Sequence, residues 1–140
     1  MIASKNKIPM TITPGQHIGQ HLTKYKQMGK EMPIAVVNGW DSTLEYTATS
    51  GIPMDVCEYD IMGAIRGEPV ELVKCETSDL EVPASAETVF AGFVSSDPAT
   101  YEWEGPFAEF TGYYAGEKRK KPSIRVECIP VGMILFLQIH

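Results

Sequence analysis

The sequence has little of several features that would point to particular classes of protein. Basic residues are in the minority, with 12 lysines and arginines against 18 acidic residues and a net charge of −6. A negative chain is repelled by phosphate backbones, which argues against nucleic acid as its main partner. No apolar run approaches the length of a membrane span, and the first residues lack the apolar core of a secretory signal. We therefore expect neither a nucleic-acid-binding protein nor a membrane-spanning one.

Cysteine is also scarce. Cys57, Cys75 and Cys128 are odd in number and form no CxxC pair. They fit buried thiols in a reducing compartment better than a disulfide framework or a zinc knot, which predicts a cytoplasmic location. The GxGxxG, P-loop, GxSxG and HExxH motifs are absent too, so nothing of this kind indicates a nucleotide-binding loop, a serine hydrolase or a zinc protease.

What the sequence does contain is the composition of one ordinary globular domain. Its 140 residues, 44% of them hydrophobic, are enough to bury a core, and we expect a single domain over residues 1–140. Helices come early and strands late, without a βαβ rhythm, which predicts an α+β domain with a mostly antiparallel sheet or barrel. The periodicity predicts helices over 14–30, 41–49 and 56–66, and strands over 33–38, 69–76, 87–94 and 123–129. The stretch Val82–Ala86, which contains Pro83, is predicted to be a turn.

The first predicted helix carries a possible metal-binding pair. Thr13, Pro14 and Gln16 have the pattern of a capping box, which predicts a helix start at this point. His17 and His21 are four residues apart and therefore share one helix face. With a carboxylate from elsewhere they could hold a divalent cation; the alternative is that both are ordinary residues of a helix surface.

The most informative segment is 101–114, in which Glu104 and Glu109 flank a Gly-Pro step among six aromatic rings. Glycine is permissive and proline lacks an N–H, so the segment should be a shaped turn and not a plain strand. Aromatic walls favour the protonated form of a carboxylate, as a general acid requires. The alternative is a surface loop with solvated acids. The basic run 118–121 is interpreted as a solvated turn, with an anion-contacting patch as its alternative.

Four segments together resemble the UbiD family of decarboxylases, which use prenylated flavin mononucleotide (FMN). The resemblance is ordered and covers about residues 10 to 130; its clearest parts are Glu58–Val70, Val73–Thr77, Asp79–Ala84, and 104–113 with its Glu-Gly-Pro-Phe and Thr-Gly-Tyr motifs. The resemblance implies a flavin-binding split β-barrel with flanking helices, an α+β fold. It also implies non-oxidative decarboxylation of an aromatic (4-hydroxybenzoate-type) or unsaturated acid, and a homo-oligomer.

The resemblance implies roles for particular residues. His17 and Glu58 match the family's metal ligands, whereas His21 matches no functional position. The metal is usually Mn²⁺, with K⁺ alongside, and it bridges the cofactor phosphate to the protein. Glu109 matches the acid that protonates the product carbon, and Glu104 matches its partner, which pairs with an arginine in the family. The positions that match cofactor-binding residues are Gln16, His17, Thr49, Ser50, Ile52 and Pro53.

The chain also departs from the family pattern at its two ends. The family's third metal ligand, an asparagine, and the arginine that pairs with Glu104 precede the position of Met1, and a long part follows about Ile129. The resemblance therefore implies a central fragment that is inactive by itself. An alternative is a non-catalytic flavin-binding or oligomerising fragment, because the apolar end from Ile134 to Ile139 would leave a strand edge to cover. A third is a flavin reductase-like split barrel.

Overall fold

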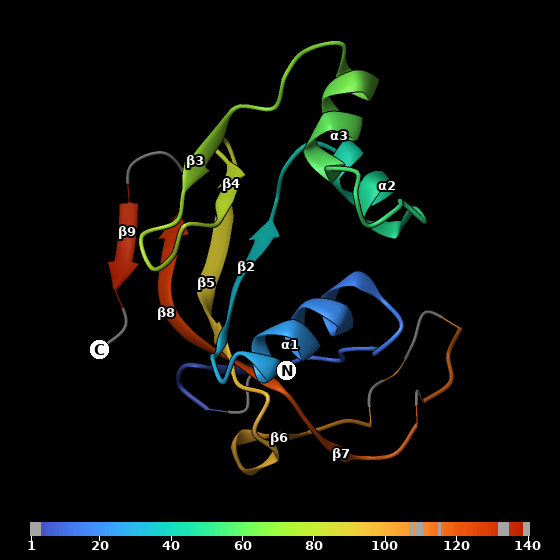
Figure 1. Cartoon of the computed structure of the whole chain (residues 1–140), viewed down its shortest axis with the longest axis vertical. Coiled ribbons are helices and arrows are strands. Elements are labelled where there is room, and N and C mark those ends of the chain that lie inside the picture. Colours follow the sequence, from blue (N-terminus) through green and yellow to red (C-terminus); the bar gives the residue numbers. More distant parts are fainter. Residues whose placement is uncertain (1–3, 107, 109–110, 115, 132–134, 139–140) are drawn as a thin grey trace. The chain divides into compact units, whose positions relative to one another are not determined.

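The protein combines helices and short strands, as the sequence predicts in coarse outline (Figure 1). The computed structural model describes residues 4–106, 108, 111–114, 116–131 and 135–138. The helices are α1 (His17–Gln27), α2 (Thr43–Thr49) and α3 (Glu58–Arg66), with a short 3₁₀ helix η1 (Pro98–Thr100). None of the helices in this described part is long and apolar enough to cross a membrane. The strands are β1 (Lys7–Pro9), β2 (Met32–Asn38), β3 (Leu72–Lys74), β4 (Glu81–Pro83), β5 (Thr88–Val94), β6 (Glu102–Glu104), β7 (Arg119–Lys121), β8 (Ser123–Val131) and β9 (Leu135–Gln138).

The strands form one larger sheet and two ribbons. In the sheet the order is β1-β8-β5-β2, and β9 pairs with β8 as well. The ribbons are β3 with β4 and β6 with β7, both antiparallel. Over the described residues these pairings close no barrel, so the split barrel stays a prediction.

The chain divides into two compact units, and each is considered by itself. Among the described residues the first unit comprises 4–34 and 92–127, and the second comprises 35–91, 128–131 and 135–138. The first holds α1, β1 and the β6–β7 ribbon, whereas the second holds α2, α3, the β3–β4 ribbon and β9. Whether the chain behaves as one domain stays a prediction.

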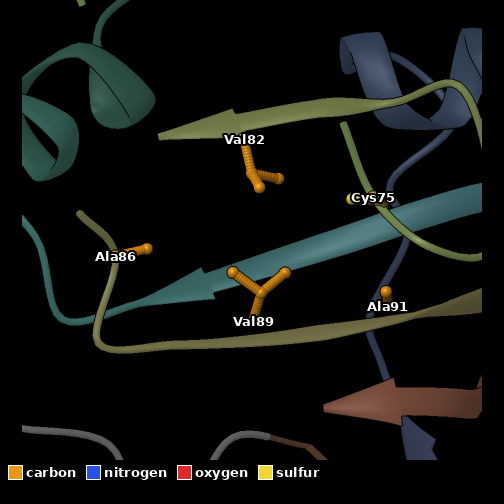
Figure 2. Packing of buried hydrophobic residues seen from close by; sticks show 5 residues of the cluster. All are labelled: Cys75, Val82, Ala86, Val89 and Ala91. Atoms are coloured by element: carbon orange, nitrogen blue, oxygen red, sulfur yellow. The ribbon is translucent and has the colours of Figure 1, made fainter. Parts of the chain in front are cut away.

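A small hydrophobic core lies in the second unit. Its buried members come from β4, β5 and the turns beside them, and Val82 and Val89 point toward one another in Figure 2. The cluster comprises Cys75, Val82, Ala86, Val89 and Ala91. The stretch 82–86 was expected to be only a turn, but its first two residues complete β4 and are buried, because pairing with β3 brings them over β5. The predicted strand 69–76 is correspondingly shorter, at Leu72–Lys74.

All three cysteines are free thiols. Cys75 and Cys128 are buried, as expected, whereas Cys57 is exposed, so the prediction of a buried thiol was wrong for Cys57. Burial, followed by the nearby Cys128, raises the pKa of the Cys75 thiol, and burial raises the pKa of Cys128. Both groups therefore stay protonated and poorly nucleophilic well into the alkaline range.

In the first unit, α1 begins three residues later than a capping box at Thr13 requires. The N–H of Gln16 donates to Thr13 O at 3.0 Å, which makes 13–16 a turn, and Gln16 becomes the N-cap without a side-chain cap bond. The capping-box prediction was therefore wrong. The reason is local: the turn folds the backbone of Thr13 and Pro14 directly against Gly19 of α1.

Candidate functional site

The segment around Glu104 is a strand that ends in a turn. Glu102–Glu104 form β6, which pairs antiparallel with β7, the core of the basic run. β6 stops at Gly105, whose φ of 83° is a left-handed conformation that glycine tolerates, so the break at the Gly-Pro step was predicted correctly. The prediction for the basic run was wrong. Residues 119–121 form a strand and not a solvated turn, because β6 supplies a pairing partner.

The two faces of the β6–β7 ribbon have different chemistry. Trp103 is 54% exposed, and the ammonium groups of Lys118 and Lys120 lie 5.7 and 5.8 Å from its ring centroid. Side chains alternate along a strand, so Glu102 and Glu104 share the opposite face. The lysines of the run are therefore divided between an aromatic contact and a carboxylate contact.

Glu104 is the best-defined acidic group of the predicted site. Only 13% of its side chain is exposed, and its Oε2 lies 2.8 Å from Lys121 Nζ. Oε2 is shut off from solvent, and no aligned hydrogen bond reaches it from the described residues, so the contact is an ion pair without good hydrogen-bond geometry. Lys121 Nζ also donates to Thr11 Oγ1 at 2.6 Å. The sequence reasoning missed Lys121; the alternation Glu-Trp-Glu opposite a basic run was the signal that could have found it.

Glu109, the predicted proton donor, lies outside the described residues, as do Phe107 and Phe110. Its role stays a prediction, as does the proposed role of Glu104. Tyr113 and Tyr114 are 78% and 75% exposed. Within the described part of the first unit, these two rings therefore do not shield a carboxylate from solvent.

Gln16 and His17 lie at the start of α1. Gln16 is exposed at the N-cap, and His17 is half-buried at the first helical position. His21, one turn further along, is exposed. The positive end of the α1 dipole lies at Gln16 and His17, where it favours an anionic group such as a phosphate.

The other predicted cofactor residues follow one another in the second unit. Thr49 ends α2 and its Oγ1 donates to Glu45 O at 2.9 Å, while Ser50 Oγ donates to Tyr46 O at 2.7 Å. Ile52 and Pro53 lie in the connection to α3, and Glu58, half-buried, is the first residue of that helix. A carboxylate in a first turn is favoured by the helix dipole.

A polar cluster that the sequence reasoning did not single out joins the start of α2 to the end of α3, where Arg66 lies 4.0 Å from a carboxylate oxygen of Asp41. The guanidinium of Arg66, the last residue of α3, lies 5.0 Å from the Trp40 ring centroid, and Trp40 Nε1 donates to Ser85 Oγ at 2.8 Å. Asp41 Oδ1 accepts from Thr43 N at 2.9 Å at the start of α2, and this bond lowers the pKa of Asp41. The cluster ties the start of α2 to the end of α3.

The predicted residues thus fall into two groups. Gln16, His17 and Glu104 belong to the first unit, and the segment from Thr49 to Glu58 belongs to the second. Within the part of the chain that is described, no three His, Cys, Asp or Glu side chains gather as a metal site would require. The metal and cofactor assignments are not tested by these positions.

Comparison with known proteins places the chain in a family. Residues 1–132 match the family model of the UbiD 3-octaprenyl-4-hydroxybenzoate carboxy-lyase Rift-related domain. The chain is 34% identical over 126 residues to a phenolic acid decarboxylase of Bacillus subtilis, covering 90% of this chain and 26% of the relative. A phenolic acid decarboxylase of Streptomyces is 37% identical over 115 residues, covering 81% and 24%.

Solved structures agree with the sequence match. The UbiD-class enzyme HmfF from Pelotomaculum thermopropionicum, in complex with FMN, superposes with a TM-score of 0.86 at 31% identity, covering 94% of this chain and 29% of that one. The vanillic acid decarboxylase of Sedimentibacter hydroxybenzoicus in its closed form gives 0.85 at 27% identity, covering 94% and 27%. The chain belongs to the UbiD family of decarboxylases. It spans about a quarter of the length of the curated relatives that it matches.

Proposed function

We propose that this chain supplies the central part of a prenylated-FMN-dependent decarboxylase that removes carbon dioxide from an aromatic, 4-hydroxybenzoate-type acid or an unsaturated acid. The observation that carries the proposal is the family match over residues 1–132, which includes His17, Glu58, Glu104 and Glu109. The relatives named above decarboxylate phenolic and vanillic acids, which supports an aromatic substrate. The FMN and prenylated FMN complexes of a structural neighbour support the cofactor.

In this proposal His17 and Glu58 hold a divalent cation such as Mn²⁺, with K⁺ beside it. An imidazole nitrogen and a carboxylate oxygen are suitable donors for Mn²⁺, and phosphate oxygens of the cofactor complete such a site. Gln16 and His17 stand at the positive end of α1, which favours the same phosphate. Thr49 at the end of α2, and Ser50, Ile52 and Pro53 in the connection to α3, would contact the flavin.

The proposed chemistry divides between the cofactor and two carboxyl groups. When bound, the prenylated flavin accepts the electron density left as carbon dioxide departs. Glu109 donates the proton that replaces the carboxyl group on the substrate carbon, and Glu104 stands beside it as an electrostatic partner. In the assembled enzyme the strands complete a split barrel, and copies associate as a homo-oligomer.

Formation of the decarboxylated phenol tests the proposal. The chain is loaded with prenylated FMN, Mn²⁺ and K⁺ and mixed with a 4-hydroxybenzoate-type acid, with the Bacillus subtilis relative assayed in parallel. We expect the chain by itself to be inactive or nearly so, with any product formed at least about a hundredfold more slowly than by the relative, because catalytic groups act as a unit and the chain spans 26% of that protein. Glu109→Gln should lower the remaining rate by about another hundredfold.

The matched control is Glu117→Gln, which changes an exposed acid of the same region and should leave the rate unchanged. A rate equal to that of the relative would contradict the slow turnover of the isolated chain. Absence of both product and flavin binding would contradict the decarboxylase proposal itself. Equal losses in the two variants would remove Glu109 from its role as proton donor.

A further inference from the structure

The β6–β7 ribbon places one particular lysine against Glu104. In the antiparallel register Glu102 lies opposite Lys121, and Glu104 lies opposite Arg119. Residues directly opposite each other point to the same face, so both carboxylates and both cations share one side of the ribbon. Lys121 can reach Glu102 directly across the ladder or Glu104 diagonally, and its Nζ lies 2.8 Å from the latter.

Two neighbouring contacts explain why Lys121 turns to Glu104. The carboxylate of Glu102 is held by Lys7 of β1, at 2.6 Å between Nζ and Oε1. On the other side, Lys121 Nζ donates to Thr11 Oγ1 at 2.6 Å. The N–H of Met10 donates to Pro122 O at 2.9 Å, which fixes Thr11 beside the end of β7. The side chain of Lys121 is therefore oriented by Thr11, a residue outside the β6–β7 ribbon.

Burial makes this ion pair different from an ordinary surface pair. Only 13% of the Glu104 side chain and 22% of the Lys121 side chain are exposed. Arg119, directly across from Glu104, is exposed to solvent. Charges that are largely withdrawn from water interact more strongly than exposed ones, and they are held in a narrower range of geometries.

We propose that Lys121, oriented by Thr11, is a positioning residue that holds the carboxylate of Glu104 in a fixed direction at the acid side of the site. The inference rests on the proposed function for the meaning of Glu104, whereas the Thr11–Lys121–Glu104 arrangement stands on its own contacts. Lys121 touches neither substrate nor cofactor in this account. It acts through Glu104.

The test follows the side-chain carboxyl ¹³C resonance of Glu104 by NMR in the chain labelled at glutamate, assigned by its disappearance in Glu104→Gln. Lys121→Met should displace this resonance, and Lys121→Arg should return it toward the wild-type position because a cation is restored. Thr11→Val, which removes only the anchor, should displace it less. Lys120→Met removes the same charge from the other face of β7, beside Trp103, and should leave it in place.

Thermal unfolding of Glu104→Gln, Lys121→Met and the double variant gives a second reading. The double variant should lose less Tm than the sum of the two single losses, because each single change breaks the same pair. Additive Tm losses, or a Glu104 resonance that Lys121→Met moves no more than Lys120→Met does, would overturn the proposal. Failure of the chain to bind prenylated FMN would contradict the proposed function and leave these two readings unaffected, so the two failures are distinguishable.

Discussion

Among the glycines that the structure describes, Gly92 should be the one whose change to alanine destabilises the protein most. A Cβ at position 92 would lie 2.1 Å from the carbonyl oxygen of Arg125, an approach that backbone atoms cannot relieve by a rotamer change. The strands β5 and β8 would have to separate locally. We expect a loss of about 3 kcal/mol or more, a large part of the usual stability of a small domain. Urea unfolding followed by circular dichroism measures it.

Gly51→Ala is the matched control for this change. A Cβ there meets nothing within 4 Å, so the effect should stay within about 0.5 kcal/mol. A Gly92→Ala variant as stable as Gly51→Ala would show that β5 and β8 do not approach each other as described.

Gly19→Ala should weaken the start of α1, where Gln16 and His17 lie. Its Cβ would stand 2.3 Å from Thr13 O and 2.7 Å from Pro14 Cα. Alanine favours a helix interior by up to about 1 kcal/mol, but the clash is larger, and we expect a net loss of about 2 kcal/mol. Because relief of the clash moves α1 away from the 13–16 turn, affinity for prenylated FMN should also fall by about tenfold or more.

Stability comes from urea unfolding and affinity from a flavin titration of the same preparation. Gly15→Ala, in the adjoining turn, meets nothing within 4 Å and should change neither quantity. A Gly19→Ala variant that is more stable than wild type would contradict the close packing of α1 on the turn. A loss of stability without a loss of affinity would separate α1 from the cofactor site.

The longer elements were predictable because their periodicity runs over several residues. The third helix was expected over 56–66 and forms over Glu58–Arg66, and the strand expected over 87–94 forms over Thr88–Val94. The short strands were not predictable in the same way. β6 and β7 have three residues each, too few to show a pattern, and they are held by their pairing with each other and by the ion pair between Glu104 and Lys121.

The residues of the candidate site likewise differ in how far the sequence alone could identify them. Glu104 could be singled out from the sequence, since its carboxylate stands before a Gly-Pro break among aromatic residues. The alternation Glu-Trp-Glu and the basic run could have indicated an ion pair, but the sequence does not say which basic residue makes it. That Lys121 does so depends on the register of β7 against β6 and on Thr11, which a one-dimensional pattern does not contain. Proline also misled the prediction at Pro83, which reads as a turn residue but lies buried in β4.

The most direct measurement of the central claim is a titration of the chain with prenylated FMN, with and without Mn²⁺, followed by flavin absorbance. We predict saturable binding that depends on Mn²⁺. His17→Ala should weaken it by at least about tenfold, since a lost metal ligand costs at least as much as a lost supporting contact. His21→Ala, exposed on the same helix, should bind as wild type does. Binding that ignores Mn²⁺, or that both variants weaken equally, would contradict the account.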